Sequence, residues 1–305
     1  MRAATVPSGA EAARAEHAGR EPIWRLRYGG TPLKPGPLMN MFWIYDIPNW
    51  LFCLITLAFF TGVSILALLL TRPYMHRLLK DNDESNDMVS FYLSAFGVFY
   101  GLTIGLIAVA TWESFSSVDA NVSQEASAIS ACYMDISRMP APHAQELQGL
   151  MKEYVRYTIE DAWPIQQKGQ IPKGGTERLT AFYDRLLAYE PTTESQKILL
   201  AEAVMQFNKI VELRRQRLQA VPSGLPPVIW IVVLVGAFLN IVLTLFFVTD
   251  NLTFHVWMTA LLASLIGLLV FLIAAMDYPF RGEFSVSAEA FEIIYERFMA
   301  TPAAK

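Results

Sequence analysis

Between Asp87 and Glu113 lie 25 consecutive residues without a single Asp, Glu, Lys or Arg. About 20 apolar residues in an α-helix are enough to cross the hydrocarbon core of a bilayer. This stretch therefore predicts a membrane-spanning helix. Three more stretches have the same character, at about 48–71, 226–248 and 252–276. They predict an all-α membrane protein with four transmembrane helices, arranged as two hairpins with a helical extramembrane domain inserted between helices 2 and 3.

The second predicted span carries a glycine at every fourth position. Gly97, Gly101 and Gly105 share one side of the helix, where another helix backbone can approach closely. We predict that these three glycines make helix-packing contacts. A conduit, if the protein forms one, is then expected along the opposite side, although a lipid-facing surface would have the same pattern. The pore-lining candidates on that side and at the membrane border are Phe99, Thr103, Leu106 and Glu113.

Polar and proline-rich segments divide the chain into five predicted parts. The first is a disordered leader that is rich in proline and glycine. The polar segment is predicted to be all-helical, and its first helix continues the second span without a break until Pro140 and Pro142. The parts are the leader (1–40), a first transmembrane hairpin (41–112), the helical polar domain (113–224), a second transmembrane hairpin (225–276) and a C-terminal tail with a short amphipathic helix (277–305).

Four spans place the polar domain and both termini on the same side of the membrane. Basic residues near the spans are more numerous on that side, six against three when the leader is counted and four against three without it. Because Lys and Arg near membrane helices favour the cytoplasm, the domain and the termini are expected to be cytoplasmic in a bacterial inner membrane. The six are Arg27, Lys34, Arg214, Arg215, Arg217 and Arg281, and the three are Arg72, Arg77 and Lys80.

The composition argues against several functional classes. A net charge of -4 does not suit nucleic-acid binding. The four histidines have no partner at metal-ligand spacing, and no nucleophile is paired with a base in sequence. The acidic loop at 81–87 has Asn86 where a calcium loop requires glycine. We therefore expect no enzymatic activity, no catalytic residues, no metal and no cofactor, with membrane lipids and further copies of the chain as the partners.

Charged side chains at the membrane borders have two readings. Asp277 and Arg281 lie one helical turn apart and can form an ion pair, whereas Glu113 repeated in an oligomer would form a charged ring. Three arginines precede the third span and can bind lipid headgroups or pair with acidic residues of the polar domain. These arginines are Arg214, Arg215 and Arg217, and the acidic residues are Glu160 and Asp161.

Five separated motifs resemble a bacterial family of membrane proteins of unknown function that is often described as bestrophin-like. They are YGLTIGLIAVATWE (100–113), EDAWP (160–164), RRQRL (214–218), LPPVIW (225–230) and DYPFRGEFSVS (277–287). They occur in the family's order and extend over nearly all of the chain from Asn40 onward. The resemblance implies a membrane location and four spans. A more distant similarity links the layout to bestrophin anion channels, which are pentamers with a pore lined by the second helix.

The bestrophin similarity implies ion conduction but not calcium gating. Animal bestrophins carry an acidic calcium clasp after the fourth span, where this chain reads DYPFRGEFSVSAEAF without an acidic cluster. The leading hypothesis is an oligomeric bestrophin-like ion channel, in which an acidic ring of Glu113 would favour cations. The alternative hypothesis is a non-conducting membrane scaffold or signalling module whose helical domain binds a protein partner.

Overall fold

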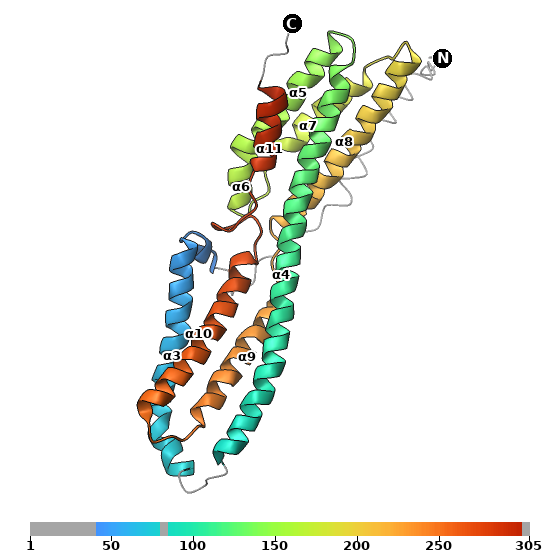
Figure 1. The fold of residues 1–305 in the computed structure, drawn as a ribbon. Helices are drawn as coiled ribbons and strands as arrows, with labels where there is room; N and C mark the ends of the chain where they lie inside the picture. Colours follow the sequence, from blue (N-terminus) through green and yellow to red (C-terminus); the bar gives the residue numbers. More distant parts are fainter. Residues whose placement is uncertain (1–40, 80–84, 301–305) are drawn as a thin grey trace, which may run out of the picture. The chain divides into compact units, whose positions relative to one another are not determined.

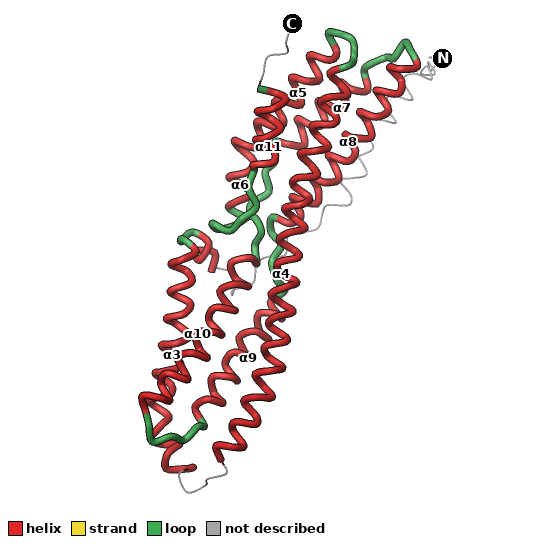
Figure 2. Tube along the Cα trace, viewed as in Figure 1, coloured by secondary structure: helices red, strands yellow, loops and turns green. Residues whose placement is uncertain are grey.

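The computed structural model describes residues 41–79 and 85–300. The chain divides into two units, Met1–Phe42 and Trp43–Lys305, and all contacts considered below lie within the second unit. The predicted leader and most of the acidic loop at 81–87 lie outside the described residues. Within the described ranges every regular element is helical (Figure 2). The α-helices are α3 (Asn49–Leu79), α4 (Ser85–Ser137), α5 (His143–Tyr157), α6 (Trp163–Gln167), α7 (Gly175–Leu187), α8 (Glu194–Ala220), α9 (Pro227–Leu245), α10 (Leu252–Met276) and α11 (Glu289–Ile294).

Shorter helical turns complete the described chain. A 3-10 turn, η2 (Met41–Tyr45), precedes α3, and two π-helical turns follow α5 and α11. The first π turn, η3 (Thr158–Ala162), ends two residues before Pro164. Proline has no N–H for the regular ladder, and its ring crowds the carbonyl four residues earlier, which accounts for the wider turn at this point. The second is η4 (Tyr295–Met299).

Four helices, α3, α4, α9 and α10, are long and apolar enough to cross a membrane, as predicted. The continuation of the second span is also confirmed, because α4 is one helix of 53 residues (Figure 1). A helix of that length extends about 80 Å, which exceeds the hydrocarbon core of a bilayer. The first helix also runs further than its apolar stretch, since α3 passes through Pro73 and ends at Leu79.

Packing between the apolar helices does not follow their order in the chain. The principal partner of α3 is α10, whereas α4 packs against α9. The backbones of α3 and α10 approach closely at Gly267, where an added Cβ would lie 3.4 Å from the carbonyl oxygen of Thr56. A hydrogen bond of 3.0 Å between the Thr61 and Ser264 hydroxyls joins the same two helices. The two predicted hairpins are therefore pairs of helices that follow one another in the chain. In the packed structure the first span lies against the last, and the second against the third.

The larger of the two hydrophobic cores lies in the polar part of the chain. The second half of α4 packs along α8, and α5, α7 and α11 complete this core (Figure 1). A capping box is present at the start of α8, with Gln196 N–H donating to the Thr193 hydroxyl over 3.2 Å. Local sequence signals therefore set the ends of the helices, while the apolar stripes bring them together.

Candidate functional site

One face of α4 is buried in the first half of the helix and the other is open. Ile104 is buried against the other apolar helices, and the Tyr100 hydroxyl donates a hydrogen bond of 3.1 Å to the Val233 carbonyl of α9. On the open face, Phe99 and Leu106 are 73% and 72% exposed. Thr103 is exposed on the same face and donates to the Phe99 carbonyl. The pore-lining candidates thus have no covering helix from the described part of their own chain.

Glu113 and the glycine stripe also lie open. Glu113 is exposed near the end of the apolar stretch. A Cβ added at Gly97, Gly101 or Gly105 would meet no described atom within 4 Å. The predicted helix packing of the stripe therefore does not occur within one chain. Packing of these glycines against another chain remains a prediction.

Close approach between apolar helices instead uses glycines that the spacing did not single out. A Cβ at Gly236 of α9 would lie 2.5 Å from two ring carbons of Tyr100, which is closer than packed atoms come. Gly267 has the corresponding role between α10 and α3. Each of these glycines is isolated in its helix, so no regular spacing marks it in the sequence.

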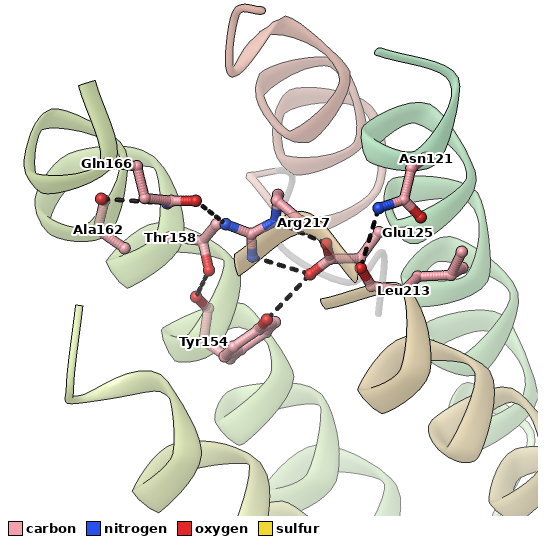
Figure 3. A network of polar contacts seen from close by, with 8 residues as sticks. All are labelled: Asn121, Glu125, Tyr154, Thr158, Ala162, Gln166, Leu213 and Arg217. Carbon is pink, nitrogen blue, oxygen red and sulfur yellow. Dashed lines mark hydrogen bonds and ion pairs between the residues drawn. The ribbon is translucent and has the colours of Figure 1, made fainter. Parts of the chain in front are cut away.

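A buried polar network joins four helices of the polar part (Figure 3). The Arg217 guanidinium on α8 donates two hydrogen bonds to the Glu125 carboxylate on α4, over 2.7 and 2.9 Å. A third bond of 2.7 Å goes to the Gln166 side-chain oxygen on α6, and the Tyr154 hydroxyl on α5 donates to Glu125 over 3.2 Å. Arg217 is 2% exposed and Glu125 is 0% exposed. The bidentate geometry and the further hydrogen bonds offset the cost of removing both charges from water, so that removing either partner alone would be unfavourable.

The surroundings of the network keep the guanidinium charged. Burial alone would lower the pKa of Arg217, but the Glu125 carboxylate outweighs that effect and raises the pKa. Aromatic rings flank the same group, since the guanidinium carbon lies 5.4 Å from the ring centroids of both Trp163 and Phe291. Burial also raises the pKa of Tyr154, so its hydroxyl stays protonated and donates a hydrogen bond to Glu125.

The structure gives the predicted arginines different partners. Arg217 is buried and pairs with Glu125, and neither Glu160 nor Asp161 is its partner. Arg214 donates to the Thr176 hydroxyl over 3.3 Å, and Arg215 lies 2.6 Å from Glu212 one turn earlier on the same helix. Glu160 and Asp161 are exposed on the π turn η3. The motifs EDAWP and RRQRL do meet, but through Trp163 and Arg217.

Sequence reasoning missed Glu125 although a signal was available. The apolar stripe of α4 runs through Val122 and Ile129, and Glu125 falls on it between them. Arg217 likewise continues a stripe on α8 that begins with Phe207, Ile210 and Leu213, all buried. A charged residue on an otherwise apolar stripe of a packed helix needs a buried partner of opposite charge. Applied to both helices, this rule would have predicted that Glu125 pairs with Arg217.

Residues 277–283, called the junction segment below, connect α10 to several other elements. Both Asp277 oxygens accept hydrogen bonds, one from the Leu225 backbone N–H and one from the Trp230 indole over 3.0 Å. The predicted ion pair of Asp277 with Arg281 is absent from the salt bridges among the described residues. Arg281 donates to the Lys168 carbonyl over 2.7 Å, and Glu283 accepts from the Asn49 N–H at the start of α3.

The arrangement is suited to holding helices in place. The described residues contain no group of three or more His, Cys, Asp or Glu side chains that could hold a metal ion. The buried charges of the network are fully engaged with each other, and the junction segment binds backbone groups of three different elements. The open face of α4 is one of the apolar surfaces available to other molecules, since α3, α9 and α10 also expose large apolar side chains.

Comparison with known proteins gives one family and one fold. The model of the bestrophin-like domain matches residues 48–291. A crystal structure of a bacterial bestrophin homologue from Klebsiella pneumoniae, carrying one mutation, superposes with a TM-score of 0.59 at 10% identity, covering 79% of this chain and 96% of that one. A second mutant of a Klebsiella pneumoniae homologue gives 0.56 at 11% identity, covering 80% and 96%. No curated protein sequence matches this chain. At these identities the structural likeness concerns the fold alone.

Proposed function

The chain belongs to the bestrophin-like family, and from this premise we propose that it assembles into a homo-oligomer that conducts small ions across a membrane. In this proposal the open face of α4 borders the conduit, with Phe99, Thr103 and Leu106 along the passage. Repeated copies of Glu113 at the border of the apolar stretch form an acidic ring that favours cations. Membrane lipids surround the remaining apolar surface.

The observation that carries the proposal is the two-sided character of α4. A helix at the edge of a bundle can expose one face to lipid, but the open face of α4 carries Thr103 among apolar residues. The same helix continues from the apolar stretch into the polar part, so a passage along it leads from the membrane into the domain. Several chains placed around a common axis would enclose such a passage between their α4 helices.

Ion flux through reconstituted protein tests the proposal. Purified protein in liposomes is expected to release a potassium or chloride gradient faster than empty liposomes do. Thr103→Trp places a large ring on the proposed lining and is expected to reduce the flux at least tenfold. The matched control is Val235→Trp on α9, which also enlarges an exposed apolar position but lies away from the proposed lining. Flux equal to that of empty liposomes under both gradients would overturn the proposal.

The subunit state separates the channel from the alternative function. Native mass spectrometry of the protein in detergent is expected to show a closed ring of identical subunits. A monomer, or a stable complex with a different protein, would favour the non-conducting scaffold or signalling module. A closed ring that gives no ion flux would contradict conduction but not the homo-oligomer.

The orientation proposed for the protein places the polar domain and the termini in the bacterial cytoplasm. The proposal rests on the excess of basic residues on the domain side of the spans. A membrane-impermeant maleimide applied to intact cells is expected to spare Gln170→Cys and to label Asp250→Cys, on the turn between α9 and α10 where the side chain is exposed. The reverse labelling pattern would place the domain outside.

A further inference from the structure

The link between the end of α10 and the start of α9 depends on one carboxylate. Asp277 directly follows α10, and its two oxygens accept from two donors at the start of the α9 region. One donor is the Leu225 backbone N–H, which stands just before two prolines that have no N–H of their own. The other is the Trp230 indole N–H, which can only donate. Both bonds therefore require an acceptor at Asp277.

Among the described residues, no charged group forms a salt bridge with this carboxylate. The Tyr45 hydroxyl donates to the Ala274 carbonyl over 3.0 Å, and its ring meets the Tyr278 ring edge-on with centroids 5.6 Å apart. Arg281 faces Tyr278, Tyr45 and Asp46 and donates to the Lys168 carbonyl. Glu283 accepts from Asn49, and α9 carries no Asp, Glu, Lys or Arg. Asp277 itself is 8% exposed.

We propose that Asp277 is an acid-sensitive latch, which holds the start of α9 to the end of α10 as a carboxylate and releases one of its two donors when it takes up a proton. The proton comes from water and adds to one carboxylate oxygen. That oxygen then becomes a hydroxyl, which is itself a donor and faces an N–H that is also a donor. One of the two hydrogen bonds is lost, while the other oxygen can still accept.

Burial moves this change to a higher pH than in an exposed aspartate. Burial raises the pKa of Asp277 above its usual range, against the opposing effect of the two hydrogen bonds. A carboxyl that binds its proton more readily in the folded chain than in the unfolded chain makes the fold more stable as the pH falls. The gain occurs between the raised pKa of the folded chain and the ordinary value of 3.8. Protonation of Asp277 thus loosens the local link without itself lowering the stability of the fold.

Fluorine NMR of the full chain in detergent micelles tests the latch. The protein is labelled with 5-fluorotryptophan, and Trp230→Phe identifies the Trp230 signal among the seven tryptophans. From about pH 8 to about pH 4, the Trp230 signal of the wild type is expected to follow a single titration curve. In Asp277→Asn it is expected to be independent of pH and to lie near the acid limit of the wild type. The Trp163 signal, from the buried network, is expected to stay in place.

The matched control is Glu283→Gln, which removes another hydrogen-bonded carboxylate from the same segment. This variant is expected to keep the wild-type titration of Trp230. Asp277→Glu keeps a carboxylate and is expected to titrate with a displaced midpoint, so the test does not depend on Asp277→Asn folding. A Trp230 signal that does not move in the wild type, or that moves equally in Asp277→Asn, would overturn the latch.

Discussion

Replacing Glu125 by alanine is expected to lower the free energy of unfolding by about 3–5 kcal/mol, because the change leaves a buried charge without its partner. Arg217 is 2% exposed and would lose both hydrogen bonds to the carboxylate. Tyr154 would lose the acceptor of its hydroxyl at the same time. Unfolding of the purified protein in mixed micelles, followed by circular dichroism, measures the effect.

Two further variants separate the buried pair from general effects of removing charge. Glu160→Ala removes an exposed carboxylate from the same part of the chain and should leave the stability nearly unchanged. The double variant Glu125→Leu with Arg217→Met replaces the pair by apolar side chains and should recover most of the loss. A Glu125→Ala protein as stable as the wild type would show that the pair is solvated or that its helices are arranged differently.

Gly236→Ala is expected to destabilise the contact between α4 and α9 by about 1–3 kcal/mol, the usual effect of overpacking. The new Cβ would lie 2.5 Å from two ring carbons of Tyr100, so the ring must move. That movement also disturbs the hydrogen bond from the Tyr100 hydroxyl to the Val233 carbonyl, which has few alternatives in an apolar environment. The midpoint of thermal unfolding in detergent should fall accordingly.

Gly97→Ala is the matched control for Gly236→Ala. The new Cβ meets no described atom within 4 Å, and alanine favours a helix over glycine by about 1 kcal/mol. The stability of the single chain should therefore stay the same or rise. Because the glycine stripe is proposed to contact another chain, the same variant should weaken the oligomer seen by native mass spectrometry. A loss of stability equal to that of Gly236→Ala would contradict the packing of α4 described above.

Local features of the chain could be predicted because their causes are local. The four spans follow from long stretches without charge, and the capping box at Thr193 follows from two residues three positions apart. The unbroken course of α4 follows from an apolar stripe that continues beyond the membrane-length stretch up to Pro140. Each of these depends on neighbours within a few helical turns.

The candidate site could be predicted only in part. Helical periodicity placed Phe99, Thr103 and Leu106 on one face, and the structure finds that face open. The same periodicity could not tell whether the glycine stripe packs within the chain, because a missing side chain permits a close approach without selecting a partner. Gly236 is packed and Gly97 is not, although both are glycines in apolar helices.

By itself the sequence determined that this protein is helical, that four of its helices are apolar enough to span a membrane and that one of them continues as a single rod. Tertiary structure alone decided which helices are neighbours and which charges meet. Glu125 and Arg217 are 92 residues apart in the chain, and α3 is paired with the last span and not with the next one. The physical reason is that apolar length and helical period act along the chain, whereas the partner of a buried charge is chosen by how the helices pack.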